Sequence, residues 1–268
     1  MLGLIGRVKR RMQRGLGQKA GLRHDWREVI GGPLKGLWFF LPSGEDTRWA
    51  DRFLTGDYEP EMLAALAELA RAGGTLYDVG AHIGFYTCAW LKLGGERVEA
   101  FEPAPYNRQV LETTLQRNGF MDKVRVHALA LGDRNGEATL LASREDVGAA
   151  SAAYLEDFGG VELPPDVQAR PLTDLEHTSV PLRRLDAIVA QMELLTPTVL
   201  KLDVEGAEVA ALAGAETLLA EWHPAILCEV HTIGNALAIA DRLARLGYVY
   251  QVLGNNGPHL ACLWSHEK

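Results

Sequence analysis

Acidic side chains stand at the ends of several short apolar stretches in this 268-residue sequence. Asp78, Glu102 and Asp203 each close one such stretch, and Glu229 and His231 close another. The ligands of a parallel sheet bind beyond the carboxyl ends of its strands, so these side chains would meet at one edge. Carboxylates and an imidazole gathered there could bind hydroxyl or ammonium groups, hold a divalent ion or transfer a proton.

The segment Asp78–Gly84 predicts a glycine-rich turn between a strand and a helix, with the sequence DVGAHIG. It differs from the G-x-G-x-x-G fingerprint because Asp78 replaces the first glycine. A carboxylate beside a pyrophosphate would cost about 4 kcal/mol at about 4 Å and an effective dielectric constant near 20. A sulfonium or ammonium group would instead be attracted. Gly80 permits close backbone approach, and Gly84 permits close helix packing. S-adenosylmethionine fits this pattern, and a plain tight turn is the alternative.

Two further acids have the placement of nucleoside contacts. Glu102 lies 24 residues after Asp78. A carboxylate there can accept hydrogen bonds from both ribose hydroxyls, each worth about 1.5–3 kcal/mol. NAD sites use the same arrangement, so Glu102 indicates an adenosine ribose without choosing the cofactor, and it could also cap the next helix. Asp133 could accept a hydrogen bond from the adenine amino group, or it could be a turn residue before Asn135.

Lys201, Asp203 and Glu205 alternate along one expected strand and its end, so they should share a side. Charges are costly to bury without partners, so together with Glu229 and His231 they predict a polar catalytic cluster. His231 or Asp203 could take a proton from an acceptor hydroxyl, and His231 is favoured because imidazole titrates near neutrality. Alternatively, Asp203, Glu229 and His231 could hold a divalent ion. A structural ion pair, with Glu205 capping the next helix, is the remaining interpretation.

The elements that must position these residues alternate between strands and helices. Helices are predicted from Pro60 to Ala70 and over 84–93, 105–118, 207–221 and 234–246. Strands are predicted over 34–41, 75–79, 97–101, 124–128, 137–141, 198–203 and 225–230, with a closing hairpin of 248–253 and 259–264. This alternation predicts an α/β fold, a mostly parallel sheet with helices on both faces and an antiparallel hairpin at the C-terminus.

Charge divides the chain into a basic head and an acidic body. Residues 1–24 carry seven basic side chains and no acid, which leaves 20 basic and 35 acidic side chains for the remainder. Such an acidic body repels nucleic acid, so we predict no nucleic-acid partner. We predict a basic extension over 1–30 and a single domain over 31–268. That domain has a strand-and-helix cap over 31–73 and an irregular insertion over 142–180, which lacks a clear period.

The basic head and the cysteines indicate where in the cell the protein is expected to be. The head interleaves charges with apolar residues and could make weak peripheral contact with an anionic membrane surface. A frayed, solvated extension is the alternative, because four glycines weaken any helix there. No signal-peptide core follows the basic residues. Three widely spaced cysteines exclude a disulfide framework, so we predict a cytoplasmic setting, with any membrane contact at the inner surface.

Together, these motifs resemble those of the FkbM-type methyltransferases over about residues 55–253. The matching segments are YEPE at 58–61, DVGAHIG at 78–84, FEP at 101–103, ALGD at 130–133, VPLRRLD at 180–186, KLDVEGAE at 201–208 and EVH at 229–231. The resemblance implies a Rossmann-like, seven-stranded class I methyltransferase fold that uses S-adenosylmethionine. It places Asp78, Gly80 and Glu102 at cofactor positions and Asp133 more weakly. His82 stands where the family usually has Asn.

The family's usual reaction is O-methylation. The resemblance therefore implies an S-adenosylmethionine-dependent O-methyltransferase that acts on a hydroxyl of a small molecule, a sugar, a glycan or a natural product. A protein that binds the cofactor without catalysis is one alternative. An NAD-dependent oxidoreductase is the other, disfavoured by Asp78 and by the missing G-x-G-x-x-G. The sequence predicts neither the acceptor nor the oligomeric state.

Overall fold

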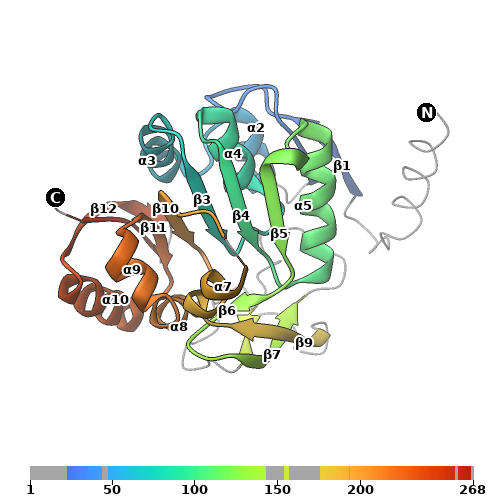
Figure 1. Cartoon of the computed structure of the whole chain (residues 1–268). Coiled ribbons are helices and arrows are strands. Elements are labelled where there is room, and N and C mark those ends of the chain that lie inside the picture. The colour runs from blue at the N-terminus through green and yellow to red at the C-terminus, as the bar shows by residue number, and fades with distance from the viewer. Residues whose placement is uncertain are drawn as a thin grey trace.

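Seven strands form the central sheet of the computed structural model, which describes residues 23–43, 48–142, 154–156, 176–192, 194–256 and 259–266. Their order is β12-β13-β11-β10-β3-β4-β5 (Figure 1). The parallel strands are β3 (Thr75–Val79), β4 (Arg97–Phe101), β5 (Val124–His127), β10 (Val199–Leu202) and β11 (Ala225–Val230). The strand order reverses between β3 and β10, which is where sheets of this kind bind ligands.

The predicted C-terminal hairpin is confirmed. It consists of β12 (Tyr248–Asn256) and β13 (His259–His266), and β13 is antiparallel to both β12 and β11. Both strands extend beyond the predicted ranges, and a bulge interrupts the register between Val252 and Gly254. Because β13 pairs with β11, the start of β13 lies beside the carboxyl end of β11.

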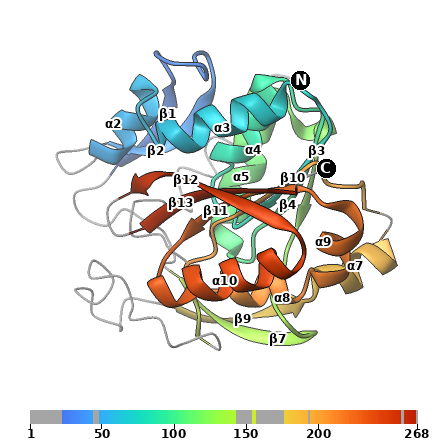
Figure 2. The same ribbon diagram turned by 90° about the vertical axis from the view of Figure 1, so that its left-hand side faces the viewer.

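Helices cover both faces of the sheet (Figure 2). On one face lie α3 (Pro60–Ala70), α4 (Phe85–Leu93) and α5 (Pro105–Asn118); on the other lie α7 (Leu185–Met192), α8 (Glu208–Ala213), α9 (Glu216–Trp222) and α10 (Ile233–Arg245). Two clusters of buried hydrophobic side chains fill the layers, one including Phe39 and Trp90 and the other including Tyr77 and Leu212. The predicted α/β fold is confirmed.

The helix predicted over 207–221 is instead the pair α8 and α9, which are separated at Gly214. A Cβ atom at Gly214 would lie 2.0 Å from the carbonyl oxygen of Gly132, so only glycine fits this approach. The Asp186 carboxylate accepts hydrogen bonds from the backbone N–H groups of Thr217 and Leu218 at 3.2 and 3.0 Å. A carboxylate from a distant segment therefore caps the start of α9, which a local sequence pattern does not reveal.

The described chain begins with an antiparallel ribbon of β1 (Arg23–Glu28) and β2 (Trp38–Ser43), followed by α2 (Arg48–Thr55). β1 lies within the predicted extension of residues 1–30, but it pairs with β2, and Val29 after it is fully buried. Residues 23–29, predicted as part of the extension, therefore belong to the cap. β2 also starts later than the predicted strand over 34–41, because a turn precedes it. Residues 1–22 lie outside the described residues, so membrane contact stays a prediction.

A second sheet lies at the ligand-binding edge, with the order β6-β9-β7-β8. Its strands are β6 (Ala130–Leu131), β7 (Gly136–Ala142), β8 (Tyr154–Leu155) and β9 (Glu176–Arg183), and a short 3₁₀ turn, Met121–Lys123, precedes β5. β7 confirms the predicted strand over 137–141. β8 and the first part of β9 fall in the stretch 142–180, which the sequence predicts to be irregular, and Pro181 inside β9 obscures the strand pattern. Residues 143–153 and 157–175 lie outside the described residues.

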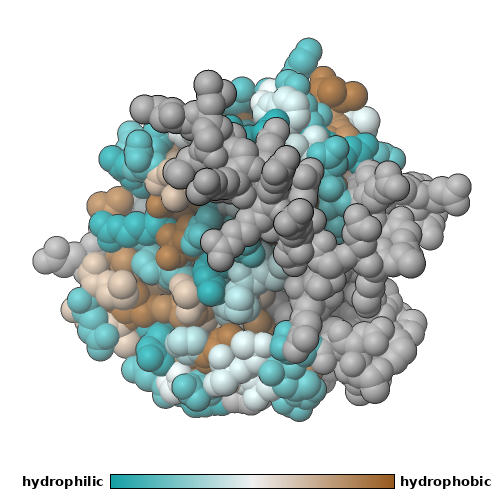
Figure 3. All heavy atoms as spheres, turned by 90° about the vertical axis from the view of Figure 1, so that its right-hand side faces the viewer, coloured by the Kyte–Doolittle hydropathy of each residue, from teal (hydrophilic) through white to brown (hydrophobic). Residues whose placement is uncertain are grey.

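The surface gives no simple guide to a partner. The side of the molecule at the right of Figure 1 carries hydrophobic patches between hydrophilic side chains (Figure 3). Apolar area of this kind is normal on globular proteins. No helix among the described residues is long and apolar enough to cross a bilayer.

Asn118, at the end of α5, fastens the N-terminal ribbon to the domain. Its Oδ1 accepts a hydrogen bond from the Trp38 N–H at 2.9 Å, and its Nδ2 donates to the Trp38 carbonyl oxygen at 2.8 Å. Asn118→Ala should lower the free energy of unfolding by about 1–3 kcal/mol, because it leaves partly buried backbone groups of β2 unpaired. Urea denaturation measures this loss. Gln116→Ala, at an exposed position of the same helix, should change stability by less than about 0.5 kcal/mol, and equal effects would contradict the assignment.

Candidate active site

A cavity of about 360 Å³ lies at the carboxyl ends of β3, β4, β10 and β11. Acidic side chains and histidines provide most of its ionisable lining among the described residues: Glu59, His82, Glu102, Asp203, Glu205, Glu229, His231 and His259. Leu140 and Leu155 from the second sheet contribute apolar wall. The cavity therefore joins the predicted cofactor turn to the predicted catalytic cluster.

Gly80 lets two strand ends approach each other at the floor of this cavity. Its φ is 80°, and a Cβ atom there would lie 1.9 Å from the carbonyl oxygen of Asp203. The Asp203 N–H donates to the Val79 carbonyl oxygen at 3.1 Å across the same junction. The predicted close approach thus involves the backbone of β10. Gly84, which starts α4, does not line the cavity, and a Cβ atom there would lie 2.5 Å from the side chain of Leu111 in α5.

His82 and Glu102 both line the cavity and are joined by a hydrogen bond. The backbone N–H of His82 donates to Glu102 Oε2 at 2.7 Å, and the N–H of Ala104 donates to Oε1 at 2.8 Å. Burial raises the pKa of Glu102 to about 7, and these hydrogen bonds oppose that rise. His82 has a φ of 50°, a conformation that is uncommon for any residue except glycine or asparagine. The backbone thus holds the Glu102 carboxylate in a fixed position at the end of β4.

Asp78 and Lys201 lie beneath the cavity and do not line it. They are neighbours in the parallel register of β3 and β10, and both are almost completely buried. Asp78 Oδ2 accepts a hydrogen bond from the Thr87 hydroxyl at 2.6 Å, and Lys201 Nζ lies 3.9 Å from Asp78 Oδ1. Burial raises the pKa of Asp78, although Lys201 and Thr87 oppose the shift. Lys201 also contacts Asp203, so this buried pair supports the cavity lining from within the sheet.

Asp133 also lies away from the cavity lining. Its side chain is 48% exposed and pairs with Arg134 at 3.3 Å, while its carbonyl oxygen accepts a hydrogen bond from Arg184 at 3.0 Å. This geometry matches the turn role that the sequence left open for Asp133. Leu131, two residues earlier, does line the cavity.

Asp203, Glu205 and His231 come together as the sequence predicts. His231 Nε2 lies 3.3 Å from Glu205 Oε2 and 3.7 Å from Asp203 Oδ1. Lys201 Nζ lies 3.1 Å from Asp203 Oδ2. Burial favours the protonated form of Asp203, but Lys201 and His231 outweigh it and lower its pKa. Burial raises the pKa of Glu205 to about 7, and its φ of 50° is a second strained backbone position in the lining.

Glu208 is a functional residue that the sequence reasoning missed as an individual, although it ends the KLDVEGAE segment. It is fully buried; its Oε1 lies 2.7 Å from His231 Nδ1 and accepts a hydrogen bond from the Gly206 N–H at 2.8 Å. Burial lowers the pKa of His231, but the bond to Glu208 and the charges of Glu205 and Asp203 prevail and raise it to about 10. The argument that His231 titrates near neutrality is therefore wrong for this environment, because three carboxylates surround one imidazole.

Glu59, Tyr86 and His259 complete the surroundings of the cluster. Glu59 and His259 line the cavity; the Tyr86 hydroxyl donates to Glu59 Oε2, and burial together with Glu229 and Asp203 raises the pKa of Glu59 to about 7. His259 Nδ1 lies 3.0 Å from Glu229 Oε1. The YEPE motif contained Glu59, but His259 belongs to no motif, and only the hairpin register places it here.

The donor set fits S-adenosylmethionine. Glu102 presents a carboxylate at the end of the second parallel strand, where ribose hydroxyls are bound in folds of this kind. The acidic lining suits a cationic ligand. The second carboxylate cluster, beyond β10 and β11, could hold an acceptor or an ion.

Comparisons with known proteins identify the family of the chain. The sequence model of the family described as the methyltransferase FkbM domain matches residues 78–250 of this chain. The 31-O-demethyl-FK506 methyltransferase FkbM of Streptomyces tacrolimicus is 32% identical over an alignment of 216 residues, and the match covers 74% of this chain and 80% of that protein. The AMB antimetabolite synthetase AmbE of Pseudomonas aeruginosa is 29% identical over an alignment of 198 residues, and the match covers 64% of this chain and only 9% of that protein.

A solved structure agrees at the level of the fold. The crystal structure of methyltransferase FkbM from Methylobacillus flagellatus KT has a TM-score of 0.52 and 18% identity. The match covers 82% of this chain and 61% of that chain. The family model covers more than half of this chain, and the Streptomyces relative is matched over most of its length. The chain belongs to the FkbM family of methyltransferases.

Proposed function

We propose that this methyltransferase transfers a methyl group from S-adenosylmethionine to a hydroxyl oxygen of a sugar, a glycan or a natural product. The observation that carries the proposal is the carboxylate cluster of Asp203, Glu205 and Glu229, which lines the same cavity as Glu102 and Gly80. An alcohol must lose a proton when it is methylated, and carboxylates can accept it. The name of the Streptomyces relative specifies a 31-O-demethyl compound, which supports an oxygen acceptor.

Glu102, the turn at Gly80 and the backbone of His82 would hold the cofactor. When bound, S-adenosylmethionine supplies a methyl group on a good leaving group. Two backbone N–H groups already orient the Glu102 carboxylate, so its remaining lone pairs are positioned for ribose hydroxyls before the ligand arrives. Leu129, Leu131 and Phe101 add apolar surface to the same cavity.

Asp203 and Glu205 are the groups that would take the acceptor proton. Both line the cavity, and their side chains are 26% and 25% exposed, so an acceptor can reach them. Lys201 holds Asp203 from below, and Glu208 holds His231 from the opposite side. Fixing the acceptor oxygen in line with the donor can lower the activation free energy by roughly 7–11 kcal/mol.

Glu102→Ala should weaken binding of S-adenosylhomocysteine roughly 10- to 100-fold, because it removes charge-assisted hydrogen bonds to the ribose. Isothermal titration calorimetry of the full chain measures this change. Asp133→Ala should leave affinity within about twofold, since Asp133 is exposed and lies outside the lining. NADH in a parallel titration should not bind. Tight NADH binding, or a loss with Asp133→Ala alone, would contradict the cofactor assignment.

Asp203→Asn should lower methyl transfer by about 10²- to 10⁴-fold, because the proton acceptor is lost. It should retain S-adenosylhomocysteine binding, because Glu102 lies at another strand end. The assay follows radiolabelled methyl groups into a panel of sugars and hydroxylated natural products, and NMR identifies an O–CH₃ group in the product.

The matched control is Asp122→Asn, at a surface turn before β5, which should keep full activity. An N–CH₃ or C–CH₃ product would exclude the hydroxyl acceptor. Cofactor binding with no methyl transfer across the panel would favour a protein that binds the cofactor without catalysis.

A further inference from the structure

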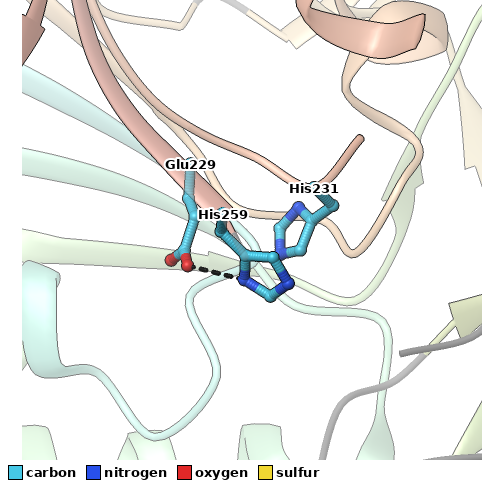
Figure 4. A group of neighbouring side chains, drawn as sticks. All are labelled: Glu229, His231 and His259. Atoms are coloured by element: carbon cyan, nitrogen blue, oxygen red, sulfur yellow. Dashed lines mark hydrogen bonds and ion pairs between the residues drawn. The ribbon is translucent and has the colours of Figure 1, made fainter. Parts of the chain in front are cut away.

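We propose that Glu229, His231 and His259 form a binding site for one divalent transition-metal ion beside the methyl-transfer site. The three side chains each offer one ligand atom, and these atoms lie within 4.8 Å of one another. They are shown in Figure 4, where the imidazoles of His231 and His259 lie side by side and the Glu229 carboxylate faces His259. The ring centroids of His231 and His259 are 4.3 Å apart.

The sheet register explains why His231 and His259, which are 28 positions apart in the sequence, lie next to each other. β11 and β13 are antiparallel, with Glu229 opposite Ala261 and Val230 opposite Leu260. Continuing this register places His231 opposite His259. Glu229 and His231 are two residues apart, so they share a face, and Glu229 is the diagonal neighbour of His259. The site is therefore built into the sheet rather than gathered by flexible loops.

His231 has the orientation of a metal ligand. Metal-bound histidines usually donate their second ring N–H to a carboxylate, which fixes the tautomer and the direction of the ring. Glu208 provides this contact at His231 Nδ1, and its other oxygen accepts a hydrogen bond from the Asn235 side chain at 2.6 Å. His231 Nε2 is left facing Asp203 and Glu205, away from Glu208. Glu208 is thus a positioning residue outside the ligand triad.

The surrounding charge favours a cation. Glu205 and Asp203 lie 3.3 and 3.7 Å from the same Nε2 atom. Lys201, the ammonium group in contact with Asp203, is shared with Asp78. Carboxylates at this density attract a positive ion, and an ion bound to His231 would lie within their field.

The ligand types indicate which ion. Two imidazoles and one carboxylate suit first-row transition metals, whereas Mg²⁺ prefers oxygen ligands. In the methyltransferase such an ion would polarise an acceptor hydroxyl; that consequence rests on the proposed function, but ion binding itself does not.

The experiment titrates Mn²⁺ into the chelator-treated full chain and follows free Mn²⁺ by electron paramagnetic resonance. We expect one saturable site per chain, weakened more than tenfold by His231→Ala and by His259→Ala. Glu208→Gln should weaken it roughly 10- to 100-fold through loss of ring orientation. The matched control is His177→Ala in β9, an exposed histidine away from the cavity. It should bind Mn²⁺ like the unchanged chain. Circular dichroism checks that each variant is folded.

A second measurement avoids substitution altogether. Co²⁺ in the unchanged chain should give visible absorption typical of nitrogen ligation, and an equal concentration of Mg²⁺ should not displace it. No saturable Mn²⁺ or Co²⁺ binding, or binding that survives both histidine substitutions, would overturn the site. S-adenosylhomocysteine titrated into the same samples separates the two ideas. If S-adenosylhomocysteine binds but neither metal ion does, only the proposed metal site is wrong. If a metal ion binds but S-adenosylhomocysteine does not, only the proposed function is wrong.

Discussion

Negative charge held at the ends of parallel strands is the constraint on which this site depends. Asp203, Glu205, Glu208 and Glu229 all lie where β10 and β11 end, and Glu208 is fully buried. Isolated buried carboxylates are too costly to keep ionised, so each must have a partner. Lys201 and His231 provide two of these partners, and both side chains are almost completely buried as well. The arrangement is stable only as a network, because removing one partner leaves another charge uncompensated.

The backbone around the network is shaped to permit this concentration of charge. Gly80 brings the end of β3 against the carbonyl group of Asp203. The hairpin of β12 and β13 adds His259 from the far end of the chain. Separate parts of the sequence therefore meet at one sheet edge, where the pairing of β3, β10, β11 and β13 brings them together. This explains why the sheet order, rather than any single loop, determines the composition of the site.

Much of this could be predicted from sequence, and the remainder could not for identifiable reasons. Strand ends followed by acids placed Glu102, Asp203, Glu205, Glu229 and His231 correctly, because burial and alternation leave a visible pattern. The same pattern could not show that Asp78 and Lys201 are buried outside the cavity lining, since β3 and β10 are buried on both faces. β9 and the division of α8 from α9 depend on long-range partners. His259 depends on register alone.

The left-handed backbone positions have a consequence of a different kind. Among the described residues, four that are not glycine have positive φ, and Glu59, His82 and Glu205 of these line the cavity. Asparagine or glycine would relax such positions. Glycine at these three positions is therefore expected to raise the thermal stability of the chain and to remove three side chains from the cavity lining. Stability and the composition of the lining thus make opposite demands on the same backbone positions.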